Sequence, residues 1–209
     1  MFKRNQVEEA IALVFEPGSA KPSSKMRTQI KRLLDTDRSL GRNKRSNDPE
    51  SANFAFYSRD GSGRGFENWF SDYEAFALLI GLRLMWHGWP QGFAVAVLRR
   101  MRPELAKHHA CILSQDVADN ELTRPRPKPG DLVVAHANPV FLTINSRDRE
   151  DPSGPNPAAI HPGQEQLMRF IKAQEVGQAW TVFELAGSAH VLSSALANSR
   201  PRKRGRGSQ

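Results

Sequence analysis

The sequence predicts an α+β fold, with a mainly helical N-terminal half and a smaller mixed domain toward the C-terminus. Apolar residues recur at helical spacing before residue 113, whereas short β-prone runs alternate with helical patterns after residue 131. The basic, proline-rich stretch TRPRPKPG at 123–130 separates the two parts and is typical of an extended linker. We therefore expect four regions along the chain: a helical domain over 1–113, a linker over 114–130, a small α+β domain over 131–196 and a disordered basic tail over 197–209.

Two short amphipathic helices are predicted at the N-terminus. Residues 5–16 and residues 24–36 each place apolar side chains on one helical face. Pro17 with Gly18 ends the first helix, and Ser23 can cap the second. The second helix carries its basic residues away from its apolar stripe. Two such helices in succession form a helix-turn-helix candidate.

A β-hairpin is predicted next, from two aromatic runs around a glycine-rich turn. Phe54–Tyr57 and Phe66–Phe70 are the expected strands, and DGSGRG at 60–65 is the expected turn. Arginines on either side of this turn would lie near the tip of the hairpin.

A helical hairpin follows in the sequence. Ser71 can cap a helix that ends near His87, and Pro90 suits the first turn of a second helix. Trp86 and Trp89 stand at the corner between the two helices, where aromatic side chains favour either a core or a contact surface.

Beyond the linker, the predicted order of elements is β-β-α-β-α. Strands are expected at 132–135, 140–144 and 180–183, and helices at 164–172 and 185–196. About 65 residues in this order indicate a small α+β domain for dimerisation or sensing.

The positive charge of the chain is concentrated at its two ends. The formal net charge is +8 overall, with +6 in residues 1–45 and +5 in residues 197–209. Residues 114–196 carry a net charge of −3. Because each cation that neutralises a phosphate releases condensed counterions, basic ends of this kind indicate binding to a polyanion.

The N-terminal half resembles a known class of regulator. The basic helix at 24–36, the glycine-tipped hairpin at 53–70 and the helix pair DYEAFALLIGLRLMWHGWPQGFAVAVLRRMRPEL at 72–105 are similar in order to the winged helix-turn-helix of MerR-like bacterial transcription regulators. The resemblance implies that the second helix enters the major groove and that the hairpin wing touches the DNA backbone. It also implies that the following helices lead to a dimer.

The residues expected to contact DNA form three groups. Arginine and lysine can read guanine edges and glutamine can read adenine, whereas contacts to phosphate position the protein without reading sequence. The candidates on the basic helix are Lys25, Arg27, Gln29, Lys31 and Arg32. Phosphate contacts are expected from Arg38, Arg42, Lys44, Arg45, Arg59 and Arg64. The tail PRKRGRG, which matches an AT-hook in part, adds Arg202, Lys203, Arg204 and Arg206.

The sequence contains no motif typical of a metal-binding, cofactor-binding, catalytic or membrane protein. His108, His109 and Cys111 fall short of the four ligands of a structural zinc, so no metal is expected, and neither is a cofactor or a catalytic group. No apolar run approaches the roughly 20 residues that span a bilayer, and no signal peptide is apparent. We expect a cytoplasmic protein, nucleoid-associated if its source is bacterial, and its single cysteine agrees with a reducing compartment.

The sequence therefore predicts a sequence-specific DNA-binding transcription regulator that acts as a homodimer and is not an enzyme. Two alternatives remain open. The basic ends could instead bind structured RNA within a nucleoprotein. The aromatic corner at Trp86 and Trp89 could also hold a protein partner, with the basic tail tethering this adaptor to nucleic acid.

Overall fold

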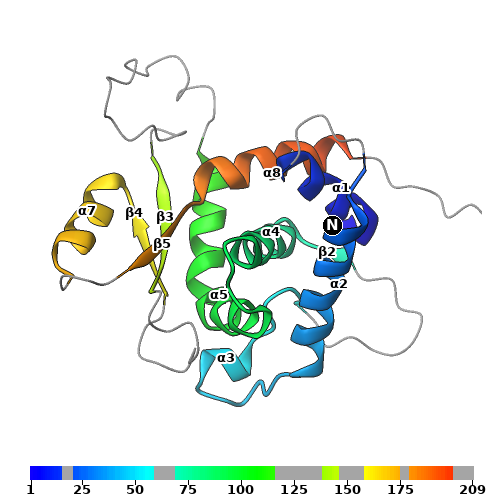
Figure 1. Cartoon of the computed structure of the whole chain (residues 1–209), viewed down its shortest axis with the longest axis horizontal. Helices are drawn as coiled ribbons and strands as arrows, with labels where there is room; N and C mark the ends of the chain where they lie inside the picture. The colour runs from blue at the N-terminus through cyan, green and yellow to red at the C-terminus, as the bar shows by residue number, and fades with distance from the viewer. Residues whose placement is uncertain (16–20, 59–68, 116–137, 146–157, 175–178, 200–209) are drawn as a thin grey trace, which may run out of the picture.

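Helices dominate the structure and two small antiparallel sheets accompany them, so the fold is mixed α/β and mostly helical (Figure 1). The structure is a computed structural model that describes residues 1–15, 21–58, 69–115, 138–145, 158–174 and 179–199. These residues contain seven helices: α1 (Arg4–Phe15), α2 (Ser24–Ser39), α3 (Pro49–Ala52), α4 (Asp72–Trp86), α5 (Gln91–Ser114), α7 (Gln164–Lys172) and α8 (Ala186–Asn198). They also contain five strands: β1 (Phe2–Lys3), β2 (Trp69–Phe70), β3 (Val140–Asn145), β4 (Ala158–Pro162) and β5 (Trp180–Glu184). Within these ranges no helix has the length and apolar character needed to cross a membrane.

The four helices predicted from apolar spacing in the N-terminal half are confirmed as α1, α2, α4 and α5. Ser23 caps α2, because its Oγ accepts the backbone N–H of Met26 at 3.2 Å. At the start of α4, Ser71 and Glu74 form a capping box in which each side chain accepts the other's backbone N–H. Gly88 has a φ of 82°, a left-handed conformation that lets the chain turn from α4 into α5. Local capping and turn chemistry therefore set the boundaries of these helices.

The predicted β-hairpin is wrong in the part of it that the structure describes. Phe54–Tyr57 is not a strand, because the carboxylate of Asp37 on α2 accepts two of its backbone N–H groups. The side chains of Phe54 and Phe56 are buried. Strand β2 pairs instead with β1, antiparallel, at the N-terminus. A winged helix-turn-helix is thus not confirmed. Residues 59–68, which include the predicted turn with Arg59 and Arg64, lie outside the described residues.

The second sheet has the strand order β4-β3-β5 and is antiparallel throughout. Its strands β3 and β5 and the helices α7 and α8 confirm predicted elements, whereas β4 was missed and residues 132–135 are outside the described ranges. The sheet lies between α7 on one side and α5 on the other (Figure 1). Leu142 and Ile144 of β3 join the apolar core through this contact.

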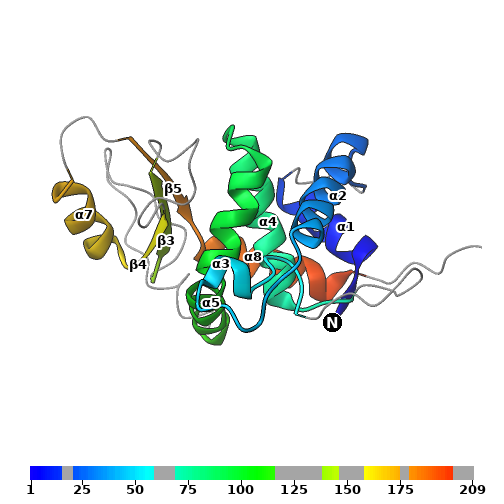
Figure 2. The same ribbon diagram turned by 90° about the horizontal axis from the view of Figure 1, so that it is seen from below.

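Helix α8 returns from the sheet to the N-terminal helices. It packs against α1, α4 and α5, so the first and last helices of the described chain lie side by side (Figures 1 and 2). Most of the buried apolar residues form one cluster that extends from Val7 of α1 to Leu196 of α8. Residues 116–130 of the predicted linker lie outside the described residues, and the division into two domains stays a prediction.

Candidate nucleic-acid interface

Helix α2 has one buried face and one exposed basic face. Met26, Ile30 and Leu33 are buried against the neighbouring helices. The helix lies at the end of the molecule opposite the three-stranded sheet (Figures 1 and 2). Its outer face exposes five of the predicted contact residues and one acidic residue, Asp35. The five are Lys25, Arg27, Lys31, Arg32 and Arg38. An excess of basic residues on one helix face is typical of a nucleic-acid-binding helix.

Two ion pairs occur on this outer face. Lys31 Nζ lies 2.8 Å from Asp35 Oδ2, and Arg27 Nε lies 3.8 Å from Glu8 Oε2 of α1. Both partners of the Lys31–Asp35 pair are exposed and screened by solvent, so a phosphate can replace this carboxylate at small cost. Glu8 is mostly buried and also binds Arg4 at 2.7 Å. Lys25 and Arg32 have no carboxylate within 4.0 Å among the residues that the structure describes.

Gln29 is placed at the margin of the basic face. Its Oε1 accepts the indole N–H of Trp86 from α4 at 3.1 Å, and its side chain is half-buried. An adenine contact by Gln29 would therefore require this hydrogen bond to break. The neighbouring Trp89 is buried and stacks on Phe93, so of the two tryptophans at the corner only Trp86 presents a large exposed surface.

The basic surface continues from α2 into the loop that follows it. The guanidinium of Arg38 lies 5.0 Å from the ring centre of Tyr57, and that of Arg42 lies 5.1 Å from the ring centre of Phe54. Cation–π contacts at this distance stabilise both arginines on the 54–57 segment. Lys44 and Arg45 are exposed in the same loop. The loop after α2 thus adds exposed basic residues to those of the outer face of α2.

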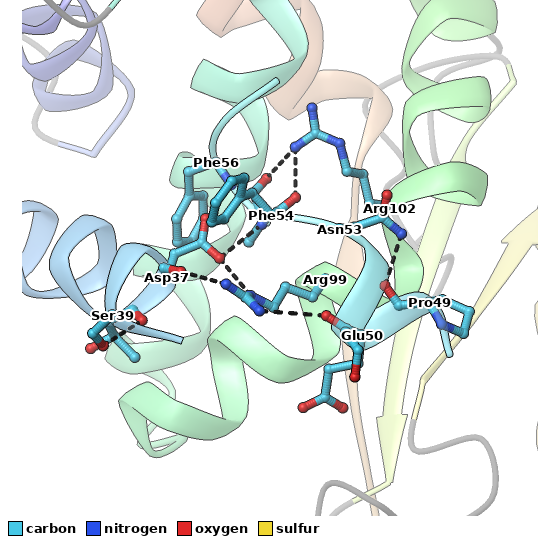
Figure 3. Close-up of polar contacts among 12 residues, drawn as sticks. Asp37, Ser39, Pro49, Glu50, Asn53, Phe54, Phe56, Arg99 and Arg102 are labelled. Atoms are coloured by element: carbon cyan, nitrogen blue, oxygen red, sulfur yellow. Dashed lines mark hydrogen bonds and ion pairs between the residues drawn. The ribbon is translucent and has the colours of Figure 1, made fainter. Parts of the chain in front are cut away.

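A buried network holds the inner side of this region in place (Figure 3). The Nε–H of Arg99 on α5 donates to Oδ1 of Asp37 on α2 at 2.6 Å. The Asp37 carboxylate also accepts the backbone N–H groups of Ala55 at 3.0 Å and Phe56 at 2.9 Å. A buried carboxylate needs this many donors, because an unpaired charge would be strongly destabilising in the core.

A second arginine of α5 binds the same segment from its other side (Figure 3). Arg102 Nη1 donates to the carbonyl oxygens of Phe54 at 2.7 Å and Ala55 at 3.1 Å. Arg102 also lies 3.7 Å from the carboxylate of Glu74, the residue of the α4 capping box. Side chains therefore bind the N–H groups of Ala55 and Phe56 and the carbonyl groups of Phe54 and Ala55. This arrangement fixes the platform on which Arg38 and Arg42 lie.

Sequence reasoning missed the Asp37–Arg99 pair, although a signal was present. Asp37 follows Ile30 by seven residues and Leu33 by four, so it falls on the apolar stripe of α2. A charged residue on a buried stripe predicts a buried partner of opposite charge. The partner itself could not be chosen from the sequence, because several arginines are available.

The remaining predicted contact residues belong to two other segments of the chain. Arg59 and Arg64 of the predicted hairpin tip, and Arg202, Lys203, Arg204 and Arg206 of the tail, lie outside the described residues.

The histidines near the end of α5 belong to the core and its margin. His109 is buried, with its ring centre 4.6 Å from that of Phe76 and 5.9 Å from that of Tyr73. Burial lowers the pKa of His109 to about 4, so the imidazole is neutral at pH 7. Cys111 is exposed, and the described ranges hold no cluster of three or more side chains suited to a metal ion.

Comparison with known proteins adds no functional assignment to this geometry. The chain matches no protein-family model, no curated protein and no solved structure. The resemblance to MerR-like regulators stays a prediction, and any functional conclusion rests on the residues described above.

Proposed function

We propose that the chain binds double-stranded DNA through the outer face of α2 and the loop that follows it, and that it acts as a transcription regulator. The observation that carries this proposal is the composition of the α2 surface, which exposes five basic residues and one acidic residue. The α-helix is also the element whose dimensions fit the major groove. On the opposite, buried side of α2, Asp37 pairs with Arg99 and joins this helix to α5.

The residues divide into two roles in this proposal. Arg27, Lys31 and Arg32 are exposed on the outer face of α2 and would reach base edges when the helix lies in the groove. Arg38 and Arg42, which lie on the aromatic rings of the 54–57 segment, bind the phosphate backbone beside the helix. Preorganised arginines lose little side-chain entropy on binding, which favours their use as anchors.

Specificity would come from a pair of such helices. A homodimer places two copies of α2 on half-sites separated by about one helical turn of DNA. A single face with about five cations gives mainly non-specific affinity, so the dimer supplies the additional contacts that regulation requires.

The experiment that tests this function is a salt titration of binding by the full chain to a labelled duplex and to a matched hairpin RNA. We expect duplex DNA to bind more tightly than RNA, because the deep, narrow major groove of A-form RNA does not admit a helix. The logarithm of the binding constant should fall linearly with the logarithm of salt concentration. Tighter binding to RNA would favour the nucleoprotein alternative. Absence of measurable binding to any duplex at about 50 mM salt would refute the proposal.

A further inference from the structure

An open cavity of about 610 Å³ lies between the ends of α1 and α4, strand β5 and the first turns of α8. This volume is within the range of roughly 300–1,000 Å³ that is typical of small-molecule sites. Phe15, Trp86 and Phe183 provide aromatic walls, and Val191 stands on an exposed rim. The rings of Phe15 and Trp86 are in contact, with centres 4.1 Å apart. The cavity is on a different part of α4 from the buried network and uses none of its residues.

Arg83 is the cation of this cavity. Its side chain is half-buried, and its Nη1 donates to the hydroxyl of Ser188 on α8. That hydroxyl in turn donates to the backbone carbonyl of Glu184 at 2.9 Å. A guanidinium has five N–H donors, and among the described residues Arg83 makes this one hydrogen bond and no ion pair within 4.0 Å. Its guanidinium also lies 6.0 Å from the ring centre of Phe15. Most of its donor capacity is therefore open to a ligand.

Glu184 also lines the cavity, but its carboxylate is directed to the start of α8. Its Oε1 accepts the N–H of Ala186 at 2.7 Å, and its Oε2 accepts the N–H of Gly187 at 2.9 Å. Both oxygens thus cap the helix and do not neutralise Arg83 by direct contact. Burial lowers the pKa of Arg83, which remains charged at neutral pH. A half-buried cation without a paired carboxylate is the feature that a bound anion would satisfy.

We propose that this cavity binds a small monocarboxylate with a flat apolar body. The carboxylate accepts two parallel N–H bonds from the planar fork of Arg83, the geometry that guanidinium groups favour. The apolar body lies against Phe15, Trp86 and Phe183. The nearby Glu184 carboxylate selects a monoanion, because a doubly charged phosphate would be repelled more strongly. The site does not depend on the proposed DNA-binding function.

The test uses the full chain in the absence of nucleic acid. Phenylacetate and indole-3-acetate are titrated by calorimetry, with phenylacetamide and indole-3-acetamide as uncharged counterparts of the same shape. We expect the acids to bind at least about tenfold more tightly than the amides, since one charge-assisted pair is removed in the amides. Equal affinity of acid and amide, or no acid binding tighter than about 1 mM, would overturn the proposal.

Variants then assign the binding to Arg83. Arg83→Gln should weaken binding of the acids by about tenfold or more and abolish the preference over the amides. Arg169→Gln, which removes an exposed arginine of α7 that pairs with Glu165, is the matched control and should leave both affinities unchanged. If Arg83→Gln retains the acid preference, the carboxylate does not bind at Arg83.

A second variant avoids any effect of Arg83 on folding. Val191 is 53% exposed on the rim of the cavity, so Val191→Glu adds a negative charge without removing a core contact. We expect it to weaken the acids several-fold and the amides little, because only the acids meet like-charge repulsion. An equal loss for both ligand classes would contradict a charge-selective site. Trp86→Phe provides a spectroscopic check, since ligand-dependent tryptophan fluorescence should arise largely from Trp86, whose ring forms a wall.

Discussion

Arg99 Nε of α5 lies 2.6 Å from Asp37 Oδ1 of α2, and both side chains are almost completely buried, with 3% and 0% of their surface exposed. This pair links the helix that carries the basic face to the longest helix of the fold. Because Asp37 also accepts two backbone N–H groups of the 54–56 segment, one carboxylate connects three parts of the chain. The basic surface is therefore built on a polar connection inside the core.

Breaking this pair should strongly destabilise the fold. Asp37→Ala leaves the Arg99 guanidinium buried without its carboxylate and leaves two N–H groups unpaired, so we expect a loss of about 3–5 kcal/mol in the free energy of unfolding. Urea denaturation followed by circular dichroism measures this loss.

The matched control lies two residues away on the same helix. Asp35 forms an exposed pair with Lys31, and Asp35→Ala should change the free energy of unfolding by no more than about 0.5 kcal/mol. Similar losses in the two variants would show that the buried pair has no special role.

The buried His109 gives the fold a defined dependence on pH. Its native pKa of about 4 lies below the ordinary value of 6.5, because burial disfavours the charged form. Between these values the unfolded chain binds more protons than the native one, so stability is full above pH 6.5 and decreases as pH falls toward 4. We expect this residue to contribute a decrease of up to about 3 kcal/mol.

The measurement compares urea denaturation at several pH values for the unaltered chain and for His109→Leu. The variant should lack this component of the pH dependence, whereas His108→Gln, on the next residue of α5, should retain it. Identical pH profiles for the unaltered chain and His109→Leu would contradict a neutral core histidine.

Close packing between helices should make Gly81 of α4 intolerant of larger side chains. A Cβ built at Gly81 lies 3.3 Å from atoms of Leu33, Leu98 and Phe56, so it already needs small movements of three neighbours. Gly81→Val adds two more methyl groups there, and we expect a loss of about 1–3 kcal/mol.

Gly92 of α5 provides the contrast. A Cβ at this position meets no atom within 4 Å, and Gly92→Ala should stabilise the fold by about 0.5 kcal/mol because alanine is the better helix former. Thermal unfolding of the two variants measures both effects. A stable Gly81→Val variant would mean that α4 does not approach α2 and α5 this closely.

The sequence anticipated those elements whose pattern is local. Each signal lies within a short stretch of sequence. Examples are the apolar spacing of α2, the Ser71 capping box of α4 and the β-prone runs of β3 and β5. Strand β4, with the sequence AAIHP, lacks the alternation and β-branched residues that mark a strand, and it was missed.

Long-range pairing was harder to predict. The 54–57 segment has β-prone aromatic residues, but its N–H groups bind the side chain of Asp37 in place of a neighbouring strand. Strand β2 pairs with β1 at the N-terminus, more than sixty residues away in the chain. Likewise, Arg83 meets Ser188 across 105 positions, so the cavity between α4 and α8 has no sequence signal. The basic face of α2, by contrast, required only the helix and its buried stripe.

The measurement that tests the nucleic-acid interface most directly compares two charge-reversal double variants in duplex binding. Lys25→Glu with Arg32→Glu alters the outer face of α2, whereas Arg169→Glu with Lys172→Glu alters α7 at the opposite end of the molecule (Figure 1). Both change the net charge equally. We expect the α2 variant to lose about tenfold or more in affinity and about two units of salt slope, with the α7 variant close to the unaltered chain. Equal losses in the two variants would show that overall charge, and not the face of α2, determines binding.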